Sequence, residues 1–149
     1  MFNKKKKNNK SFTLVELLVV IAIIGILAVV AVPSLFANIN KSKAAKIESD
    51  FATVRTAVSS AYADGTALDS IVSKTMTELG VDGLTGKDVN YTLAAKKNAS
   101  NVTTGIYLVA ATSDTDIANR VIQDLGAGVA SLKTEDTTNK TVNLLVLGN

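Results

Sequence analysis

An uninterrupted run of apolar residues near the N-terminus constrains this chain more than any other feature. No side chain from Leu17 to Val32 is polar, and the apolar segment as a whole extends from Phe12 to Val32. As an α-helix with a rise of about 1.5 Å per residue, this segment would be about 31 Å long, which matches a bilayer hydrocarbon core of about 30 Å. Because a small domain rarely buries a helix that is apolar on every face, a membrane helix is favoured over a buried core helix.

The charges that precede this segment predict its orientation. The first eleven residues contain no acid and five lysines, which are Lys4, Lys5, Lys6, Lys7 and Lys10. Since positive charge stays on the cytoplasmic side of a membrane, we expect this leader to lie inside and the C-terminal part of the chain to lie outside. From Phe12 onward there are 11 basic and 13 acidic residues, so the net charge of +3 reflects the leader and not a basic nucleic-acid-binding face.

The absence of cysteine and histidine excludes several kinds of chemistry. The chain can form no disulfide framework, no zinc-thiolate site, and neither a Ser-His-Asp nor a Cys-His nucleophile. We therefore expect no enzyme activity, no catalytic residue, no metal and no cofactor. Three pairs of acids could offer oxygens to calcium, but solvated loops or helix caps are favoured for each: Asp82 with Asp88, Asp114 with Asp116, and Glu135 with Asp136.

Glu16 is the one charge inside the apolar segment, and two interpretations of it remain open. The spacing from Thr13 to Glu16 is that of a capping box, in which the acid closes the first turn of a helix. Alternatively, cleavage between Ser11 and Phe12 would create an α-ammonium group four residues before Glu16. The ammonium group of a neighbouring subunit could then neutralise the carboxylate where the dielectric constant is low.

The sequence from Lys10 to Glu16, KSFTLVE, followed by LLVVIAIIGILAVVAVP, resembles the prepilin-type (class III) signal of type IV pilins and pseudopilins. The shared features are the short lysine-rich leader, Phe12 at the cleavage point, Glu16 four residues later, Gly25 in mid-segment and Pro33 at its end. The resemblance covers roughly residues 4–40, a quarter of the chain. One departure is Ser11, where the family usually has glycine.

The resemblance implies an assembly pathway. A prepilin peptidase would cleave after Ser11 and methylate the amine of Phe12, and the subunit would wait in the cytoplasmic membrane. An assembly ATPase and a platform protein would then draw it into a helical filament of identical subunits, a surface pilus used for adhesion or motility. In that filament Glu16 would pair with the Phe12 amine of an adjacent subunit. Gly25 and Pro33 would allow the helix to lose regular structure.

Two alternatives accompany this interpretation. The first is a pseudopilin of a type II secretion or competence (DNA uptake) system, which shares the assembly chemistry. The second is a secreted binding protein with an ordinary signal peptide, cleaved after Val29-Val30-Ala31 so that the mature chain begins at Val32. For the basic residues Lys41, Lys43, Lys46 and Arg55, a solvated helix face or contact with an acidic neighbour is favoured over nucleic-acid binding, because few aromatic residues accompany them.

We predict three parts of the chain: a cleaved leader at 1–11, a membrane and filament-core helix at 12–33, and a globular pilin domain at 34–149. The domain should include the second half of the long helix, which ends at Asp64 with Gly65 as its cap. Its apolar stripe comprises Leu35, Phe36, Ile39, Ile47, Phe51, Val54, Val58 and Tyr62. The opposite face carries Lys41, Lys43, Lys46, Glu48, Asp50 and Arg55.

The remainder of the chain predicts an α+β fold of the pilin type. A short helix from Leu68 to Leu79 should begin with a capping box at Thr66, and a second helix should span Ile117 to Leu125. Four strands are expected at Val89–Ala95, Ile106–Thr112, Val129–Leu132 and Val142–Leu147, with turns at 96–104 and 134–140. They should form an antiparallel sheet with the long helix on one face.

Overall fold

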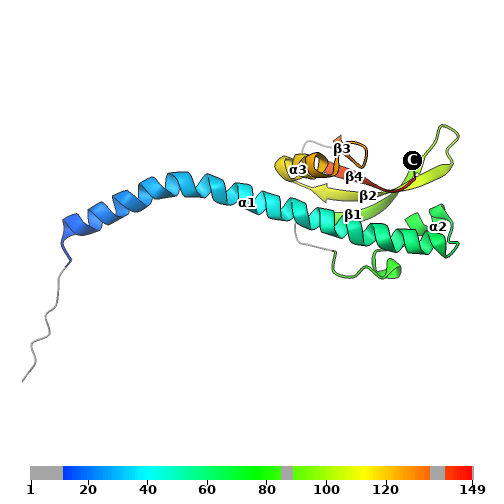
Figure 1. The fold of residues 1–149 in the computed structure, drawn as a ribbon, viewed down its shortest axis with the longest axis horizontal. Helices are drawn as coiled ribbons and strands as arrows, with labels where there is room; N and C mark the ends of the chain where they lie inside the picture. The colour runs from blue at the N-terminus through cyan, green and yellow to red at the C-terminus, as the bar shows by residue number, and fades with distance from the viewer. Residues whose placement is uncertain (1–11, 85–88, 135–139, 149) are drawn as a thin grey trace, which may run out of the picture. The chain divides into compact units, whose positions relative to one another are not determined.

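The computed structural model describes residues 12–84, 89–134 and 140–148. Its elements in chain order are α1 (Leu14–Ala63), α2 (Leu68–Val72), the 3-10 helix η1 (Thr77–Leu79), β1 (Asn90–Lys97), β2 (Thr103–Thr112), α3 (Thr115–Leu125), β3 (Ala130–Thr134) and β4 (Lys140–Leu147) (Figure 1). The four strands form one sheet in the order β1-β2-β4-β3, and every neighbouring pair is antiparallel. The predicted α+β class, a long N-terminal helix with a small antiparallel sheet, is confirmed.

The chain divides into two compact units, Met1–Asn38 and Ile39–Asn149, and α1 contributes to both. In the first unit, the apolar side chains of α1 are exposed and none is buried. By length and composition α1 could cross a membrane, and none of its most apolar window is buried. An isolated copy therefore leaves this part of the helix without an apolar environment.

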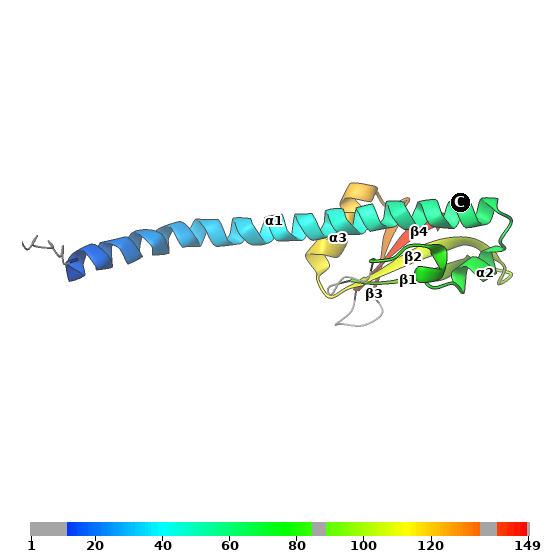
Figure 2. The ribbon, with the colours of Figure 1, turned by 90° about the horizontal axis from the view of Figure 1, so that it is seen from below.

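The second unit has a continuous apolar core. Helix α1 contributes Ile47, Phe51, Val54 and Val58, whose spacing of three or four residues places them on one helix face. The other buried apolar residues are Ala44, Ile71, Val81, Leu84, Tyr91, Ile106, Leu108, Ala110, Ile117, Ala118, Val121, Ala130, Val142, Leu144 and Val146. The second half of α1 and α3 lie beside each other in both views (Figures 1 and 2). The core thus joins α1, α2 and α3 to the sheet.

The end of α1 agrees with the sequence prediction. Gly65 has a φ of +86°, in the left-handed region that favours glycine. Its N–H donates to the carbonyl of Tyr62 at 3.0 Å, and the N–H of Thr66 donates to that of Ala61 at 3.1 Å. This pair of bonds is the Schellman arrangement, which satisfies carbonyls that the end of a helix would leave unpaired.

The predicted helix from Leu68 to Leu79 is wrong as a single element. It forms α2 and η1 separately, and α2 begins after Ala67 without a side-chain cap, so the proposed box at Thr66 does not form. The Asp69 carboxylate instead accepts the Thr103 hydroxyl at 2.5 Å and ties α2 to the start of β2. A capping box forms nine residues later, before η1, where the Glu78 carboxylate accepts the N–H of Thr75 at 2.7 Å and its hydroxyl at 2.9 Å.

The predicted polar face of α1 is wrong at Asp50, which is buried. Its Oδ2 accepts the hydroxyl of Tyr91 at 2.9 Å and lies 2.8 Å from the ammonium nitrogen of Lys46. Burial, followed by the bond to Asp50, raises the pKa of the Tyr91 hydroxyl. Asp50 follows Ile47 by three residues and precedes Val54 by four, so helix geometry places it on the buried face.

Glu48, expected on the solvated face, is partly buried. Its Oε1 is enclosed and has no hydrogen-bond partner among the described residues. Burial, followed by the negative charge of Asp124 on α3, raises the pKa of the Glu48 carboxyl. Arg120 offsets part of this effect and donates to Asp124 at 2.8 Å.

The predicted apolar stripe is buried only in its middle. Its four members before Ala44 and after Val58 are largely exposed: Leu35, Phe36, Ile39 and Tyr62. All four strands are present, but the turn expected at 96–104 is shorter, because β1 continues to Lys97 and β2 begins at Thr103. Asn98 closes that turn by accepting the N–H groups of Ser100 and Val102. The expected turn at 134–140 falls mostly outside the described residues.

Candidate assembly site

The predicted capping box at the start of α1 forms as one compact hydrogen-bonded group. Oε2 of Glu16 accepts the N–H of Thr13 at 2.9 Å and the hydroxyl of Thr13 at 2.8 Å. In return the N–H of Glu16 donates to the Thr13 hydroxyl at 3.2 Å. These bonds give partners to the N–H groups of Thr13 and Glu16 and give one carboxylate oxygen two partners inside the chain.

The surroundings of this group are apolar and exposed. Phe12, the residue at the expected cleavage point, is 84% exposed, and every apolar side chain over the next four turns is also largely exposed. Ser11 lies outside the described residues. Nothing in the described chain covers the carboxylate of Glu16, so a neighbouring molecule could reach it.

Helix α1 continues through both residues predicted to make it flexible. Pro33 lies inside α1 and cannot donate a backbone hydrogen bond to the preceding turn. Apart from its chain neighbours and the backbone of its own helix turns, no described heavy atom lies within 4 Å of the position that a Cβ on Gly25 would take. The helical state of one copy therefore contains two positions where the helix is intrinsically weaker.

The other candidate residues mainly have structural partners. Asp114 is the N-cap of α3 and accepts the N–H of Asp116 at 2.8 Å, as a helix cap does. Among the described residues there is no group of three acids or histidines that could hold a metal. Asp88, Glu135 and Asp136 lie outside the described residues. Lys46 of the basic strip pairs with Asp50.

Sequence reasoning missed the polar contact between α1 and β1 and the capping box before η1. The Thr-x-x-Glu spacing at residues 75–78 is visible in the sequence and repeats that at residues 13–16. The hydrogen bond between Asp50 and Tyr91 is indicated more weakly by the sequence. The only sign of it is that Asp50, an acid, occupies a position that the helical period assigns to the core.

The family model described as the prokaryotic N-terminal methylation motif matches residues 6–32. Fimbrial protein Q of Moraxella bovis is 32% identical over 123 residues, which cover 80% of this chain and 76% of that protein. Type IV major fimbrial protein FimA of Dichelobacter nodosus is 41% identical over 64 residues, 43% of this chain and 40% of that protein. Type II secretion system core protein G of Klebsiella michiganensis is 39% identical over 54 residues, 36% of this chain and 38% of that protein. No solved structure matches.

Together, the fold and the site describe an α+β protein with a long N-terminal helix. The first half of that helix is apolar and exposed, and the Glu16 carboxylate forms a capping box at its start. The match to Fimbrial protein Q covers most of both chains, and the methylation motif coincides with the apolar half of α1. The chain belongs to the type IV pilin family. Membership of this family implies polymerisation into a filament.

Proposed function

We propose that this chain is a structural subunit of a type IV pilus, anchored in the cytoplasmic membrane with its leader inside until it joins a surface filament. A prepilin peptidase hydrolyses the peptide bond between Ser11 and Phe12 and methylates the new amine. An assembly ATPase and a platform protein then drive polymerisation. The observation that carries this proposal is the methylation motif lying on an apolar helix half that the chain itself leaves uncovered.

Glu16 is the assembly residue in this proposal. In a single copy the Thr13 bonds satisfy Oε2 of Glu16, which lowers the cost of keeping a carboxylate near the end of a membrane helix. After cleavage, the Phe12 ammonium of an adjacent subunit supplies the opposite charge. In the apolar interior of a filament, an ion pair of this kind fixes the axial register between subunits, because each charge would be costly without the other.

The first test is the N-terminal residue of the protein at the cell surface, identified by mass spectrometry of its first peptide. N-methylated Phe12 is the expected result. A chain that begins at Val32 would indicate an ordinary secreted protein, and an intact Met1 would indicate a membrane protein that is never processed. Either of those results would contradict the proposal.

A pair of substitutions separates the charge of Glu16 from its capping role. Glu16→Ala should leave the protein in the membrane and abolish or distort the filaments. Glu16→Gln keeps an oxygen that can accept the Thr13 bonds but removes the charge, so it should also lose filaments if pairing with an ammonium group is essential. Normal filaments from Glu16→Gln, examined by electron microscopy, would reduce the role of this residue to helix capping.

A pseudopilin is the second candidate, supported by the similarity to a type II secretion core protein. The two candidates share the processing step and differ in the product. Deletion of the chain should remove surface pili without affecting protein export if it is a pilin. Loss of export, or of DNA uptake, with surface pili unchanged would instead favour the pseudopilin.

A further inference from the structure

The charged residues of α1 are distributed unevenly along the helix. From Leu17 to Ile47 every charged residue is a lysine, and two of these lysines precede Ala44, the first buried residue of the domain core. We call these two residues, Lys41 and Lys43, the lysine collar. Lys41 is exposed and Lys43 is partly exposed. In the sequence the collar thus separates the apolar half of α1 from the part that the domain buries.

The charges at the two ends of the apolar half define a membrane span. No residue between Glu16 and Lys41 is charged, and Ser34 is the only polar side chain in residues 17–36. As a helix, those twenty residues are about 30 Å long, which equals the thickness of a hydrocarbon core. This span begins at residue 17 and not at residue 12, so that it keeps the Glu16 carboxylate at the inner boundary. A charge costs less there than at the bilayer centre.

With this span, the lysine collar lies at the level of the outer headgroups. Lys41 follows Phe36 by five residues of α1, which corresponds to about 7.5 Å. The headgroups of each leaflet extend about 5–7 Å beyond the hydrocarbon core. The long stem of a lysine lets its ammonium group reach along an apolar surface toward such a layer. Lipid phosphates are therefore within reach of the collar.

The two lysines of the collar lie on different sides of the helix. Residues two positions apart are separated by about 200° around an α-helix. A single acidic surface on a protein would meet Lys41 or Lys43, but not both. A layer of lipid headgroups surrounds a membrane helix on every side, so it can contact both lysines at once. This arrangement favours a lipid surface over an acidic protein as the partner.

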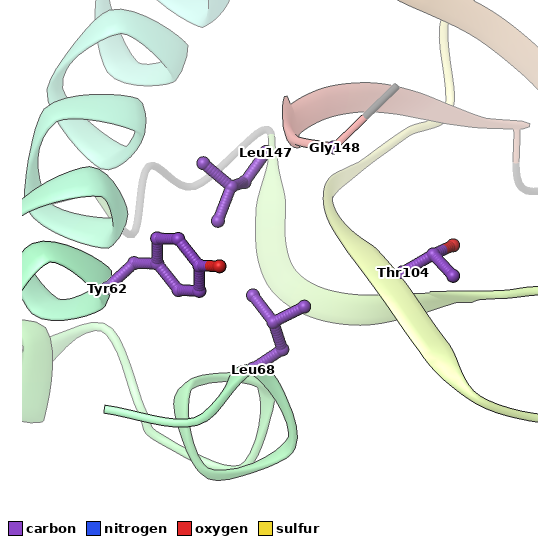
Figure 3. A pocket seen from close by; sticks show the side chains of 5 residues that line it. All are labelled: Tyr62, Leu68, Thr104, Leu147 and Gly148. Carbon is purple, nitrogen blue, oxygen red and sulfur yellow. The ribbon is translucent and has the colours of Figure 1, made fainter. Parts of the chain in front are cut away.

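The end of α1 that is farther along the chain has the opposite charge. Between Arg55 and Lys74 the charged residues are Asp64 and Asp69. A pocket of about 440 Å³ at this end is lined by uncharged residues, which are Tyr62, Leu68, Thr104, Leu147 and Gly148 (Figure 3). An anionic surface would therefore be attracted by the lysine collar and repelled by the end of α1.

We propose that the lysine collar binds the phosphate groups of anionic lipids in the outer leaflet of the cytoplasmic membrane before the subunit is assembled. This inference rests on the proposed function, because it requires the leader inside and the domain outside. Entry into a filament must then break the lipid contacts, since the helix leaves the bilayer. The collar therefore opposes release of the subunit from the membrane.

Tryptophan quenching tests the contact in a chain that has no tryptophan of its own. Phe36→Trp introduces a fluorophore at an exposed site five residues before the collar. The full chain is reconstituted in phosphatidylcholine bilayers that contain phosphatidylglycerol, and either lipid carries brominated chains that quench tryptophan. Quenching should show that phosphatidylglycerol binds more tightly than phosphatidylcholine near this reporter. Adding Lys41→Gln/Lys43→Gln should lower that preference about fivefold or more, the effect of one lysine near an anionic surface.

Three controls separate the collar from other charges. Arg55→Gln removes an exposed cation of α1 that lies fourteen residues, or about 21 Å, beyond Lys41, and it should keep the preference. Lys41→Arg/Lys43→Arg retains both charges and should also keep it. A reporter at the inner end, Leu18→Trp, senses lipids near the leader, so its preference should not respond to Lys41→Gln/Lys43→Gln.

The outcomes distinguish this inference from the proposed function. Equal binding of the two lipids near the Phe36→Trp reporter, or a preference that survives Lys41→Gln/Lys43→Gln, would overturn the lipid contact and leave the pilin function intact. No quenching of that reporter by brominated phosphatidylcholine would overturn the span itself. A surface protein that begins at Val32 would instead contradict the proposed function, because it would lack the membrane helix. If the double variant does not fold, Lys41→Gln alone should still lower the preference.

Discussion

The two halves of α1 use the same secondary structure but are stabilised in different ways. From Ala44 onward, apolar side chains at helical spacing are buried against strands and a second helix. Before Asn38 the helix is richer in apolar residues, yet none of the described side chains there is buried. The apolar content of a helix therefore does not show where its partner lies.

The comparison also separates local from tertiary stability. The first half has a capped N-terminus, but none of its described side chains is buried, so a bilayer or neighbouring subunits must provide its apolar surroundings. The second half is fixed by its own chain before any assembly. This division suits a subunit that must fold its domain first and exchange the environment of its helix afterwards.

Removal of a large side chain from the core should give the largest difference between the two halves. Phe51→Ala should lower the free energy of unfolding of the domain by about 3–5 kcal/mol, because it leaves a cavity among residues that cannot fully collapse. Ile24→Ala removes an exposed apolar side chain and should leave that energy unchanged. Urea unfolding of the full chain in detergent micelles, followed by circular dichroism, measures both, and equal losses would contradict the comparison.

The buried polar contact between α1 and β1 should give the next largest effect. Tyr91→Phe removes the hydroxyl bond to the buried carboxylate of Asp50 and should cost about 1.5–3 kcal/mol of unfolding free energy. The matched control is Tyr62→Phe, which deletes the same atom from a half-exposed tyrosine and should change stability by less than about 0.5 kcal/mol. If the two variants unfold at the same urea concentration, the hydrogen bond between Tyr91 and Asp50 does not stabilise the packing of α1 against β1.

The sequence was most informative where one periodic signal was strong. The apolar run, the Thr13–Glu16 box, the stop at Gly65 and the α+β class all depend on local spacing, and the structure contains each of them. Processing at Ser11 and Phe12 and the pairing of Glu16 involve other molecules, so they stay predictions.

The errors occurred where tertiary contacts override local preference. The charge of Asp50 predicts a place on the solvated face. Tyr91, distant in sequence, instead donates a hydrogen bond that offsets the cost of burying the Asp50 carboxylate. Thr66 has the spacing of a cap, yet Asp69 is drawn away by Thr103 on β2. The close approach of the backbone at Gly105 and Gly148 could not be foreseen either, because it joins residues distant in sequence.

Removal of a helix cap should change the free energy of unfolding of the domain by a smaller amount, and only when the cap belongs to the domain and not to the first half of α1. Asp114→Ala removes the side chain that accepts the N–H of Asp116 and should lower the free energy of unfolding of the domain by about 1 kcal/mol. Thr13→Ala removes the comparable cap at the start of α1, but it should leave domain unfolding unchanged because no described side chain in that turn is buried. Urea midpoints test both, and a loss from Thr13→Ala would show that the two regions are energetically coupled.

The smallest effect concerns Glu48, whose carboxyl meets Asp124 of α3 and has a raised pKa in the folded chain. A group whose folded pKa lies above its unfolded value contributes stability at pH values below the unfolded pKa and loses it as the pH rises through the folded pKa. The domain should therefore lose this contribution as the pH rises above about 4.3, the ordinary value for glutamate.

Glu48→Gln, which cannot ionise, should abolish this part of the pH dependence and unfold at a higher urea concentration than the wild type at neutral pH. If Glu48→Gln keeps the wild-type slope, the contact between α1 and α3 does not respond to protonation of Glu48.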